Sequence, residues 1–243
     1  MKAKLFPAPV LLLALFANRI LTGCSVAEKP DFSAARRRMV AVQLAGRDIT
    51  NQLVLQAMRT VPRHELVPDP LRRYAYDDHP LPIGHDQTIS QPYIVAFMTQ
   101  ALNPRTNDVV LEVGTGSGYQ AAVLAGLVKQ VYTIEIVEPL ARRAEANLNR
   151  LAFTNVQVRA GDGYQGWPSS APFDAIIVTC APDHIPQPLV DQLREGGRMI
   201  IPVGPAGDQS LYLLRKEGGK VRQQAILPVR FVPMTGKVNN PER

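Results

Sequence analysis

The fold is decided by the stretch Val109-Val110-Leu111-Glu112-Val113-Gly114-Thr115-Gly116-Ser117-Gly118-Tyr119. Its first five residues, four of them apolar, predict a buried parallel strand, and apolar residues at helical spacing follow from Ala121 to Leu127. The glycines at 114, 116 and 118 permit a sharp turn and let a ligand come close to the main chain. A strand, a glycine turn and a helix in this order are typical of a nucleotide-type cofactor site at the carboxyl end of a parallel strand.

The acidic residues around this turn indicate which cofactor it holds. Glu135 ends the next predicted strand and lies 21 residues after Gly114 (135 − 114), where a carboxylate can accept hydrogen bonds from ribose hydroxyls. A dinucleotide site has the pattern G-x-G-x-x-G, but here Tyr119 stands where the third glycine belongs. This spacing, together with Glu112, favours S-adenosylmethionine over NAD. A plain strand-to-helix turn is the alternative.

Composition limits the classes of protein and partner. With 243 residues the chain has room for one large α/β domain and a small extension. The net charge of +6 falls to +3 (6 − 3) if Lys2, Lys4 and Arg19 are removed with a leader. Arg36-Arg37-Arg38 is the only basic run, and no aromatic residues interleave with it, so we expect no nucleic-acid partner. The histidines and cysteines lack ligand spacing, so we expect no metal.

The N-terminus resembles a targeting segment. Residues 1–24 combine a basic start with a short apolar run, Val10 to Phe16, and end in Leu21-Thr22-Gly23-Cys24, which resembles a lipoprotein cleavage box. In that interpretation Cys24 carries a lipid anchor and the protein is periplasmic and bound to the envelope. Arg19 inside the apolar region opposes export. An unstructured leader, or a start at Met39, is the alternative.

The segment before the glycine turn is predicted to be mainly helical. Residues 25–35 are expected to form a linker, and a helical cap over 36–80 follows. One helix should run from Ser33 to Ala45 and stop at Gly46, a second should be capped by Thr50, and Asp69-Pro70 should open a third. Leu81 to Gln87 is expected to be a loop in which Gly84 permits lid motion, and Ser90 is placed to cap a helix that ends at Asn103-Pro104.

Strands and helices then alternate, which implies a doubly wound, mostly parallel sheet. This α/β core is expected over residues 81–238, within a domain of 36–238 and before a tail of 239–243. Gly196-Gly197 should separate a helix from a strand, and Glu217-Gly218-Gly219-Lys220 should close a hairpin that gives the sheet an antiparallel edge. The predicted elements are strands 131–135, 156–159, 175–179, 198–203, 210–214 and 225–232, and helices 138–151 and 188–193.

In such a sheet, ligands bind where the parallel strands end. Three further strand ends are expected beside the glycine turn: Glu135, Gly161-Asp162-Gly163 and Thr179-Cys180-Ala181. Asp162 is placed to accept a hydrogen bond from an adenine amino group; its other role would be that of a turn residue between two glycines. Cys180 follows an apolar strand and is expected to be buried or to line the pocket.

Six stretches of the sequence together carry a specific resemblance. They are Gln87-Thr88-Ile89-Ser90-Gln91-Pro92, the stretch from Leu111 to Ala122, Gly161-Asp162-Gly163, the stretch from Pro172 to Thr179, Gly196-Gly197-Arg198-Met199, and Val229-Arg230-Phe231-Val232-Pro233. Together they resemble the protein-L-isoaspartate O-methyltransferase family, and the Thr-Ile-Ser motif separates this family from other methyltransferases. The resemblance runs from about Arg37 to Gly236. The sequence departs from the family in the segment before residue 36 and at Cys180, where alanine is more usual.

The resemblance implies methyl transfer from S-adenosylmethionine to the α-carboxylate of L-isoaspartyl residues in damaged proteins and peptides, which initiates repair through a succinimide. It implies that Ser90 occupies the catalytic position, where its hydroxyl hydrogen-bonds the substrate carboxylate. The expected cofactor-binding residues are Glu112, Gly114, Thr115, Gly116, Ser117, Gly118, Glu135, Asp162 and Gly163. The expected substrate-binding residues are Thr88, Ile89, Ser90, Thr179, Val229, Phe231 and Val232, with the segment from Val229 to Pro233 as an extended strand along the peptide.

Other functions remain open at this point. The chain could methylate a different acceptor with the same cofactor, act as an NAD-dependent dehydrogenase, or be a non-catalytic envelope lipoprotein that retains the fold. A monomer is expected. The family resemblance implies a cytoplasmic location, whereas the leader favours export.

Overall fold

The structure, a computed structural model, describes residues 31–236. The predicted leader of 1–24 with Cys24, most of the linker and the tail of 239–243 lie outside the described residues. The described part belongs to one compact unit that begins at Asp31. Between residues 31 and 236, no helix has the length and apolar character needed to cross a bilayer.

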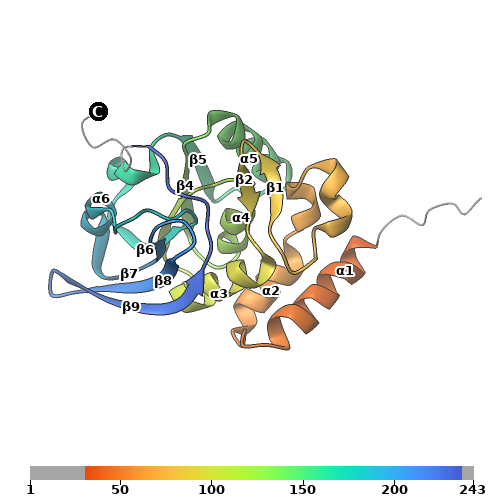
Figure 1. Ribbon diagram of the computed structural model, residues 1–243, viewed down its shortest axis with the longest axis horizontal. Coiled ribbons are helices and arrows are strands. Elements are labelled where there is room, and N and C mark those ends of the chain that lie inside the picture. Colours follow the sequence, from red (N-terminus) through yellow and green to blue (C-terminus); the bar gives the residue numbers. More distant parts are fainter. Residues whose placement is uncertain (1–30, 237–243) are drawn as a thin grey trace, which may run out of the picture. The chain divides into compact units, whose positions relative to one another are not determined.

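A seven-stranded sheet forms the centre of the molecule, in the order β5-β4-β3-β6-β7-β8-β9 (Figure 1). The pairs from β5 to β7 are parallel, and β8 and β9 add an antiparallel edge. This confirms the predicted doubly wound, mostly parallel fold. The strands are β3 (Val109–Val113), β4 (Gln130–Glu135), β5 (Val156–Ala160), β6 (Phe173–Val178), β7 (Leu193–Val203), β8 (Gln209–Glu217) and β9 (Lys220–Val229).

Each face of the sheet packs into its own hydrophobic core. Side chains alternate between the two faces along a strand; Val110 therefore belongs to one core, while Leu111 and Val113 belong to the other. The first core contains the helices α3 (Pro92–Leu102), α4 (Tyr119–Ala125) and α5 (Glu138–Arg150). The second contains α6 (Gln187–Asp191) and the side chains that follow the 3₁₀ turns η4 (Gly163–Gln165) and η5 (Pro168–Ser170).

The helical cap comprises five short helices beside the sheet (Figure 1). The predicted first helix is present, but only its first half is α-helical. The second predicted helix begins one residue later than expected, because Asn51 rather than Thr50 caps it and accepts from the amides of Leu53 and Val54 at 3.0 and 3.2 Å. The helices are α1 (Phe32–Arg38), the π-helix η1 (Met39–Ala45), α2 (Gln52–Thr60) and the 3₁₀ helices η2 (Arg63–Leu66) and η3 (Asp69–Tyr74).

Arg63 connects the cap to the glycine turn. Its side chain is fully buried, its Nε donates to the carbonyl of Ala75 at 2.7 Å, and its guanidinium lies 4.7 Å from the ring centroid of Tyr119. Tyr119 is the first residue of α4, and its hydroxyl contacts the sulfur of Met58 in α2 at 3.6 Å. Contacts from two cap helices therefore fix the start of the helix that follows the glycines.

The predicted loop at Leu81 to Gln87 is wrong: the structure has a hairpin there, formed by β1 (Leu81–Gly84) and β2 (Gln87–Ile89). Its two-residue turn consists of His85 and Asp86, both with positive φ, at 54° and 56°. Ile83 is completely buried, and its carbonyl accepts a hydrogen bond from Arg143 of α5. The buried side chain of Ile83 and the hydrogen bond from Arg143 to its carbonyl both anchor the hairpin.

Three other expectations about element boundaries are corrected. Ser90 does not cap α3, because the cap position is Gln91 and no side chain fills that role. Gly196-Gly197 does not precede β7 but lies inside it, where the pairing register with β6 shifts. The last strand ends at Val229, so the segment from Arg230 to Pro233 continues beyond the sheet ladder.

Candidate active site

The glycine turn leaves β3 and approaches the neighbouring strands closely. The amides of Gly114 and Thr115 both donate to the carbonyl of Ile134 in β4, at 2.8 and 3.2 Å. On the other side, the hydroxyl of Thr179, just after β6, donates to the carbonyl of Gly114 at 2.6 Å. A Cβ at Gly114 would collide with that hydroxyl. Glycine is therefore required where the turn passes between two strand ends.

Glu135, at the end of β4, hydrogen-bonds to the backbone of the glycine turn. Its Oε2 accepts from the amide of Gly116 at 2.7 Å, and its Oε1 accepts from the amide of Val137 at 3.0 Å. The side chain is 5% exposed and lines the pocket. Each carboxylate oxygen can accept more than one hydrogen bond, so Glu135 can still accept from a ligand's hydroxyls.

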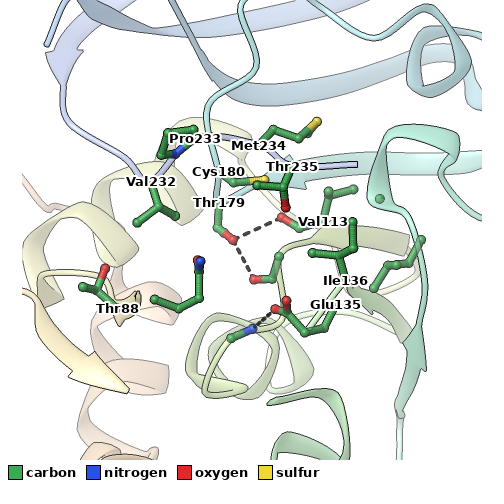
Figure 2. Close-up of a pocket in the computed structure, with 15 residues that line it drawn as sticks. Thr88, Val113, Glu135, Ile136, Thr179, Cys180, Val232, Pro233, Met234 and Thr235 are labelled. Carbon is green, nitrogen blue, oxygen red and sulfur yellow. Dashed lines mark hydrogen bonds between the residues drawn. The ribbon is translucent and has the colours of Figure 1, made fainter. Parts of the chain in front are cut away.

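The first cavity, here called the cofactor pocket, has a volume of about 550 Å³. Figure 2 shows Val232, Pro233, Met234 and Thr235 along one side of this pocket and Glu135 with Ile136 on the other. The chain after β9 therefore closes over the carboxyl ends of β3 and β4. The lining residues are Gln87, Thr88, Val113, Gly114, Gly116, Ile134, Glu135, Ile136, Gly163, Thr179, Cys180 and Val232 to Thr235.

The second cavity, the inner chamber, shares Gly114 and Gly116 of the glycine turn with the cofactor pocket and has a volume of about 400 Å³. It contains the completely buried carboxyl group of Glu112, and neither of its oxygens makes a hydrogen bond with another residue between 31 and 236. Burial raises the pKa of Glu112 to about 8, and the Thr133 hydroxyl, itself bonded to Thr115 at 2.6 Å, partly offsets this effect. The other lining residues are Thr88, Ile89, Ser90, Val95, Met98, Gly114, Thr115, Gly116, Ser117, Tyr119, Gln120 and Thr179.

The third cavity, the groove, is open and has a volume of about 1650 Å³. One wall comes from the segment around β2 and α3, and the other from the end of β9 and the residues after it. Ser90 belongs to both the groove and the inner chamber, and its hydroxyl makes no hydrogen bond with the described residues. The lining residues are Pro80, Thr88, Ser90, Gln91, Ile94, Thr179, Gly207, Asp208, Gln209 and Pro228 to Pro233.

Thr88 and Thr179 line all three cavities. Thr88 lies in β2 and Thr179 follows β6, so the hairpin and the end of the sheet meet at this junction. A ligand in the cofactor pocket and a second ligand in the groove would therefore be adjacent at these two threonines, beside Ser90. This arrangement suits the transfer of a group between two bound molecules.

The structure brings most of the expected site residues together, but not all of them. Gly118 lines none of the three cavities; a Cβ there would come within 3.2 Å of Leu148, so its role is to pack α4. Asp162 is also outside the linings, and it accepts from the amide of Tyr164 at 2.9 Å. Its neighbour Gly163 does line the cofactor pocket.

The structure adds lining residues that the sequence did not single out. Gln87, Ile136, Met234 and Thr235 border the cofactor pocket, and Arg230 borders the groove. Gln87 and Arg230 belong to motifs that carry the family resemblance, whereas Ile136, Met234 and Thr235 had no signal beyond their position in the sequence next to expected residues. Cys180 lines the cofactor pocket as expected; burial, with smaller contributions from Glu135 and Asp162, raises the pKa of its thiol to about 12.

The described part of the chain contains no candidate metal site. Between residues 31 and 236, no group of three or more His, Cys, Asp or Glu side chains is arranged to hold a metal ion.

A family model, sequence relatives and solved structures all identify the same family. The profile of protein-L-isoaspartate(D-aspartate) O-methyltransferase (PCMT) matches residues 35–239. The protein-L-isoaspartate O-methyltransferase of Opitutus terrae is 59% identical over 201 residues, which cover 82% of this chain and 86% of that one. Protein-L-isoaspartate O-methyltransferase 1 of Cupriavidus necator is 49% identical over 244 aligned positions, covering 95% and 94%.

Solved structures agree with the sequence relatives. A protein-L-isoaspartate O-methyltransferase superposes with a TM-score of 0.75 at 29% identity, covering 84% of this chain and 67% of that one. A Plasmodium falciparum structure assigned to the same activity, in complex with S-adenosyl-L-homocysteine, gives 0.72 at 26% identity, covering 82% and 98%.

Proposed function

Because the chain belongs to the protein-L-isoaspartate(D-aspartate) O-methyltransferase family, we propose that its three connected cavities hold the two reactants of that family's reaction. The enzyme transfers a methyl group from S-adenosylmethionine to the α-carboxylate of L-isoaspartyl residues in damaged proteins. The resulting ester cyclises to a succinimide, which can reopen to normal aspartate.

We assign S-adenosylmethionine to the cofactor pocket and the inner chamber, which share Gly114 and Gly116 of the glycine turn. When bound, this cofactor supplies a methyl group on a positively charged sulfonium. We assign Glu135 to its ribose hydroxyls, because the carboxylate lines the pocket at the end of β4. Glu112 is a buried carboxyl group that makes no hydrogen bond within residues 31–236, which suits a cationic ammonium group. The Gly161-Asp162-Gly163 turn is assigned to the adenine because Gly163 lines the cofactor pocket, and Thr115 and Ser117 are assigned to the inner wall.

The residues around the groove have to align the acceptor, not activate it. A carboxylate is already charged and nucleophilic at neutral pH, so the reaction needs no strong general base. We assign the hydroxyl of Ser90 to donating a hydrogen bond to the substrate carboxylate at the junction. We assign the peptide backbone to Ile89, at the end of β2, and to Val229, Phe231 and Val232 at and after the end of β9. Holding two reactants in an attack geometry can be worth about 7–11 kcal/mol of barrier.

The observation that carries this proposal is the shared lining of Thr88 and Thr179. These residues connect the pocket that contains Glu135 to the groove that contains Ser90. Water can be displaced from the junction when both cavities are filled, which favours the neutralisation of a sulfonium by a carboxylate.

The test is methyl transfer from labelled S-adenosylmethionine to two synthetic peptides that differ only in L-isoaspartate or L-aspartate at one position. The full chain should methylate only the isoaspartyl peptide. Retention of cofactor without methylation of either peptide would point to a different acceptor or to a fold kept for binding. Methylation of both peptides would remove the specificity for isoaspartate.

We also propose that the chain acts as a monomer, since residues of one chain line both the pocket and the groove. Sedimentation velocity gives the oligomeric state.

Cys24 is proposed to carry a lipid anchor in the envelope, on the basis of the Leu21-Thr22-Gly23-Cys24 sequence alone. Labelled palmitate should enter the wild-type protein and not Cys24→Ala.

A further inference from the structure

The groove has two charged lining residues, Asp208 and Arg230. They lie next to each other across the sheet edge, because Gln209 pairs with Val229 at the end of the β8–β9 ladder. Both side chains are exposed. Among residues 31–236, no ion pair joins these two side chains or engages either with another residue. Both charges are therefore available to a ligand in the groove.

The backbone of Arg230 is fixed on both sides. Val229 belongs to the ladder, and the side-chain amide of Gln209 clamps Phe231: its Oε1 accepts from the amide of Phe231 at 2.6 Å, and its Nε2 donates to the carbonyl at 3.2 Å. A fixed backbone reduces the entropy lost when the side chain binds. Arg230 thus presents an unpaired guanidinium from a rigid position on the groove wall.

We propose that Arg230 is a specificity-determining residue that selects isoaspartyl peptides with an acidic side chain close to the isoaspartyl residue. This inference rests on the proposed function. A guanidinium matches a carboxylate with two parallel hydrogen bonds. Asp208 lies beside Arg230 and repels an acidic ligand, so it reduces this preference but does not neutralise Arg230 through an ion pair.

The acceptor carboxylate itself is not the partner of Arg230. That carboxylate has to reach the junction at Thr88 and Thr179, beside the cofactor pocket. Arg230 lines the groove but neither the cofactor pocket nor the inner chamber. An extended peptide advances about 3.3–3.6 Å per residue, so a side chain one or two positions away can reach the wall while the acceptor occupies the junction.

The experiment compares kcat/KM for isoaspartyl peptides that carry glutamate or lysine at each of the two positions on either side of the isoaspartyl residue. An exposed charge pair of this kind corresponds to a preference of about two- to five-fold for glutamate at the best position. The preference should disappear in Arg230→Gln, reverse in Arg230→Glu, and fall as added salt screens the charges. The matched control is Arg222→Gln, also on β9, exposed and paired with Glu217 at 3.4 Å outside the groove.

The outcomes separate this inference from the function on which it rests. Equal kcat/KM for the glutamate and lysine peptides in the wild type would overturn the inference alone. So would a loss in Arg230→Gln that is the same for both peptides, because Arg230 would then act on the acceptor carboxylate they share. Absence of methylation on every isoaspartyl peptide would overturn the proposed function and the inference with it.

Discussion

The carboxylate of Glu135 and the amide of Gly116 are joined by a hydrogen bond of 2.7 Å, so the end of β4 fixes the glycine turn that follows β3. Glu135 also accepts from the amide of Val137. One carboxylate therefore fixes the glycine turn and lines the cofactor pocket at the same time.

Glu135→Gln tests this double role. An amide side chain has one acceptor oxygen, so one of the two backbone amides loses its partner. Hydrogen bonds to charged groups are worth about 1.5–3 kcal/mol, so the dissociation constant of S-adenosylmethionine should rise by about 10- to 100-fold in calorimetry. Glu138→Gln is the control, because that exposed carboxylate pairs with Arg142 on the surface of α5. Equal affinity in both variants would show that Glu135 is not needed for binding.

Ser90→Ala should slow turnover without weakening cofactor binding. Ser90 lies where the groove meets the inner chamber, and we assign its hydroxyl, which makes no hydrogen bond with the described residues, to the substrate carboxylate and not to the cofactor. Loss of one hydrogen bond to the carboxylate should lower kcat by about 10- to 100-fold. Ser170→Ala, in the surface turn η5, provides the control. If the variant lost cofactor affinity and turnover by the same factor, Ser90 would belong with the cofactor-binding residues.

Gly116→Val should abolish cofactor binding. Gly116 has a φ of +53°, and a Cβ there would lie 3.4 Å from Cδ1 of Ile83, in the space between the turn and the hairpin. The matched control is Gly218→Val at the tip of the β8–β9 hairpin, where φ is +60° and no atom lies within 4 Å of a Cβ. Both variants carry the same backbone strain, so binding by Gly218→Val and not by Gly116→Val would isolate the effect of filling the site.

Glu112 should make cofactor affinity depend on pH. Its pKa of about 8 means that the empty protein holds a proton there at neutral pH. A cationic ligand group favours the carboxylate and releases that proton, so affinity should rise as the pH increases from 6 to 8. In Glu112→Gln this rise should be absent. A wild-type affinity that stays constant over the same range would contradict the assignment of Glu112 to a cation.

The same group predicts the direction in which pH changes the stability of the empty protein. Glu112 binds its proton more tightly when folded than in the unfolded chain, where the pKa is near 4.5. The contribution is fully present below 4.5 and is lost as the pH rises to about 8. The free energy of unfolding should fall across this window by up to about 1.4 kcal/mol per pH unit, and Glu112→Gln should remove that slope in denaturant titrations.

Arg143→Ala should release the β1–β2 hairpin. Arg143 of α5 donates to the carbonyl of Ile83, and Thr88 and Ser90 depend on the position of this hairpin. We expect faster hydrogen exchange at hairpin amides and a higher KM for the peptide. Arg142→Ala is adjacent on the same helix and removes only a surface pair with Glu138. Unchanged exchange in Arg143→Ala would show that the buried side chains of Leu81, Ile83 and Ile89 are sufficient to anchor the hairpin.

The sequence predicted the elements whose signals are local. The apolar run of β3, the glycines after it and the acid at the end of β4 specify one arrangement, and the structure has it. The hairpin at Leu81–Ile89 was missed because its strands are four and three residues long, one contains proline, and its turn uses His85 and Asp86 instead of glycine. Ser90 was expected to cap α3 because serine is a common capping residue. The preceding strand extends to Ile89, however, and α3 starts two residues after Ser90.

The contacts that complete the site are not local, and no single stretch could predict them. The clamp of Gln209 on Phe231 joins segments 22 residues apart, and Thr179 reaches Gly114 over 65 residues. The cavity around Glu112 is defined by side chains from β2, α3 and the glycine turn together. Such spaces depend on how the elements pack, and the alternation of apolar residues specifies only which face of each element is buried.

The buried link between Arg63 and Tyr119 has a consequence for how the molecule can be divided. The cap and one face of the sheet share a single hydrophobic core that includes Met39, Leu44 and Met58 beside Val110 and Ile177. The boundary near residue 80 is therefore not a place where the chain can be cut into autonomous modules. The cap and the sheet should melt in one cooperative transition, and a cap could be exchanged between relatives only together with the sheet face against which it packs.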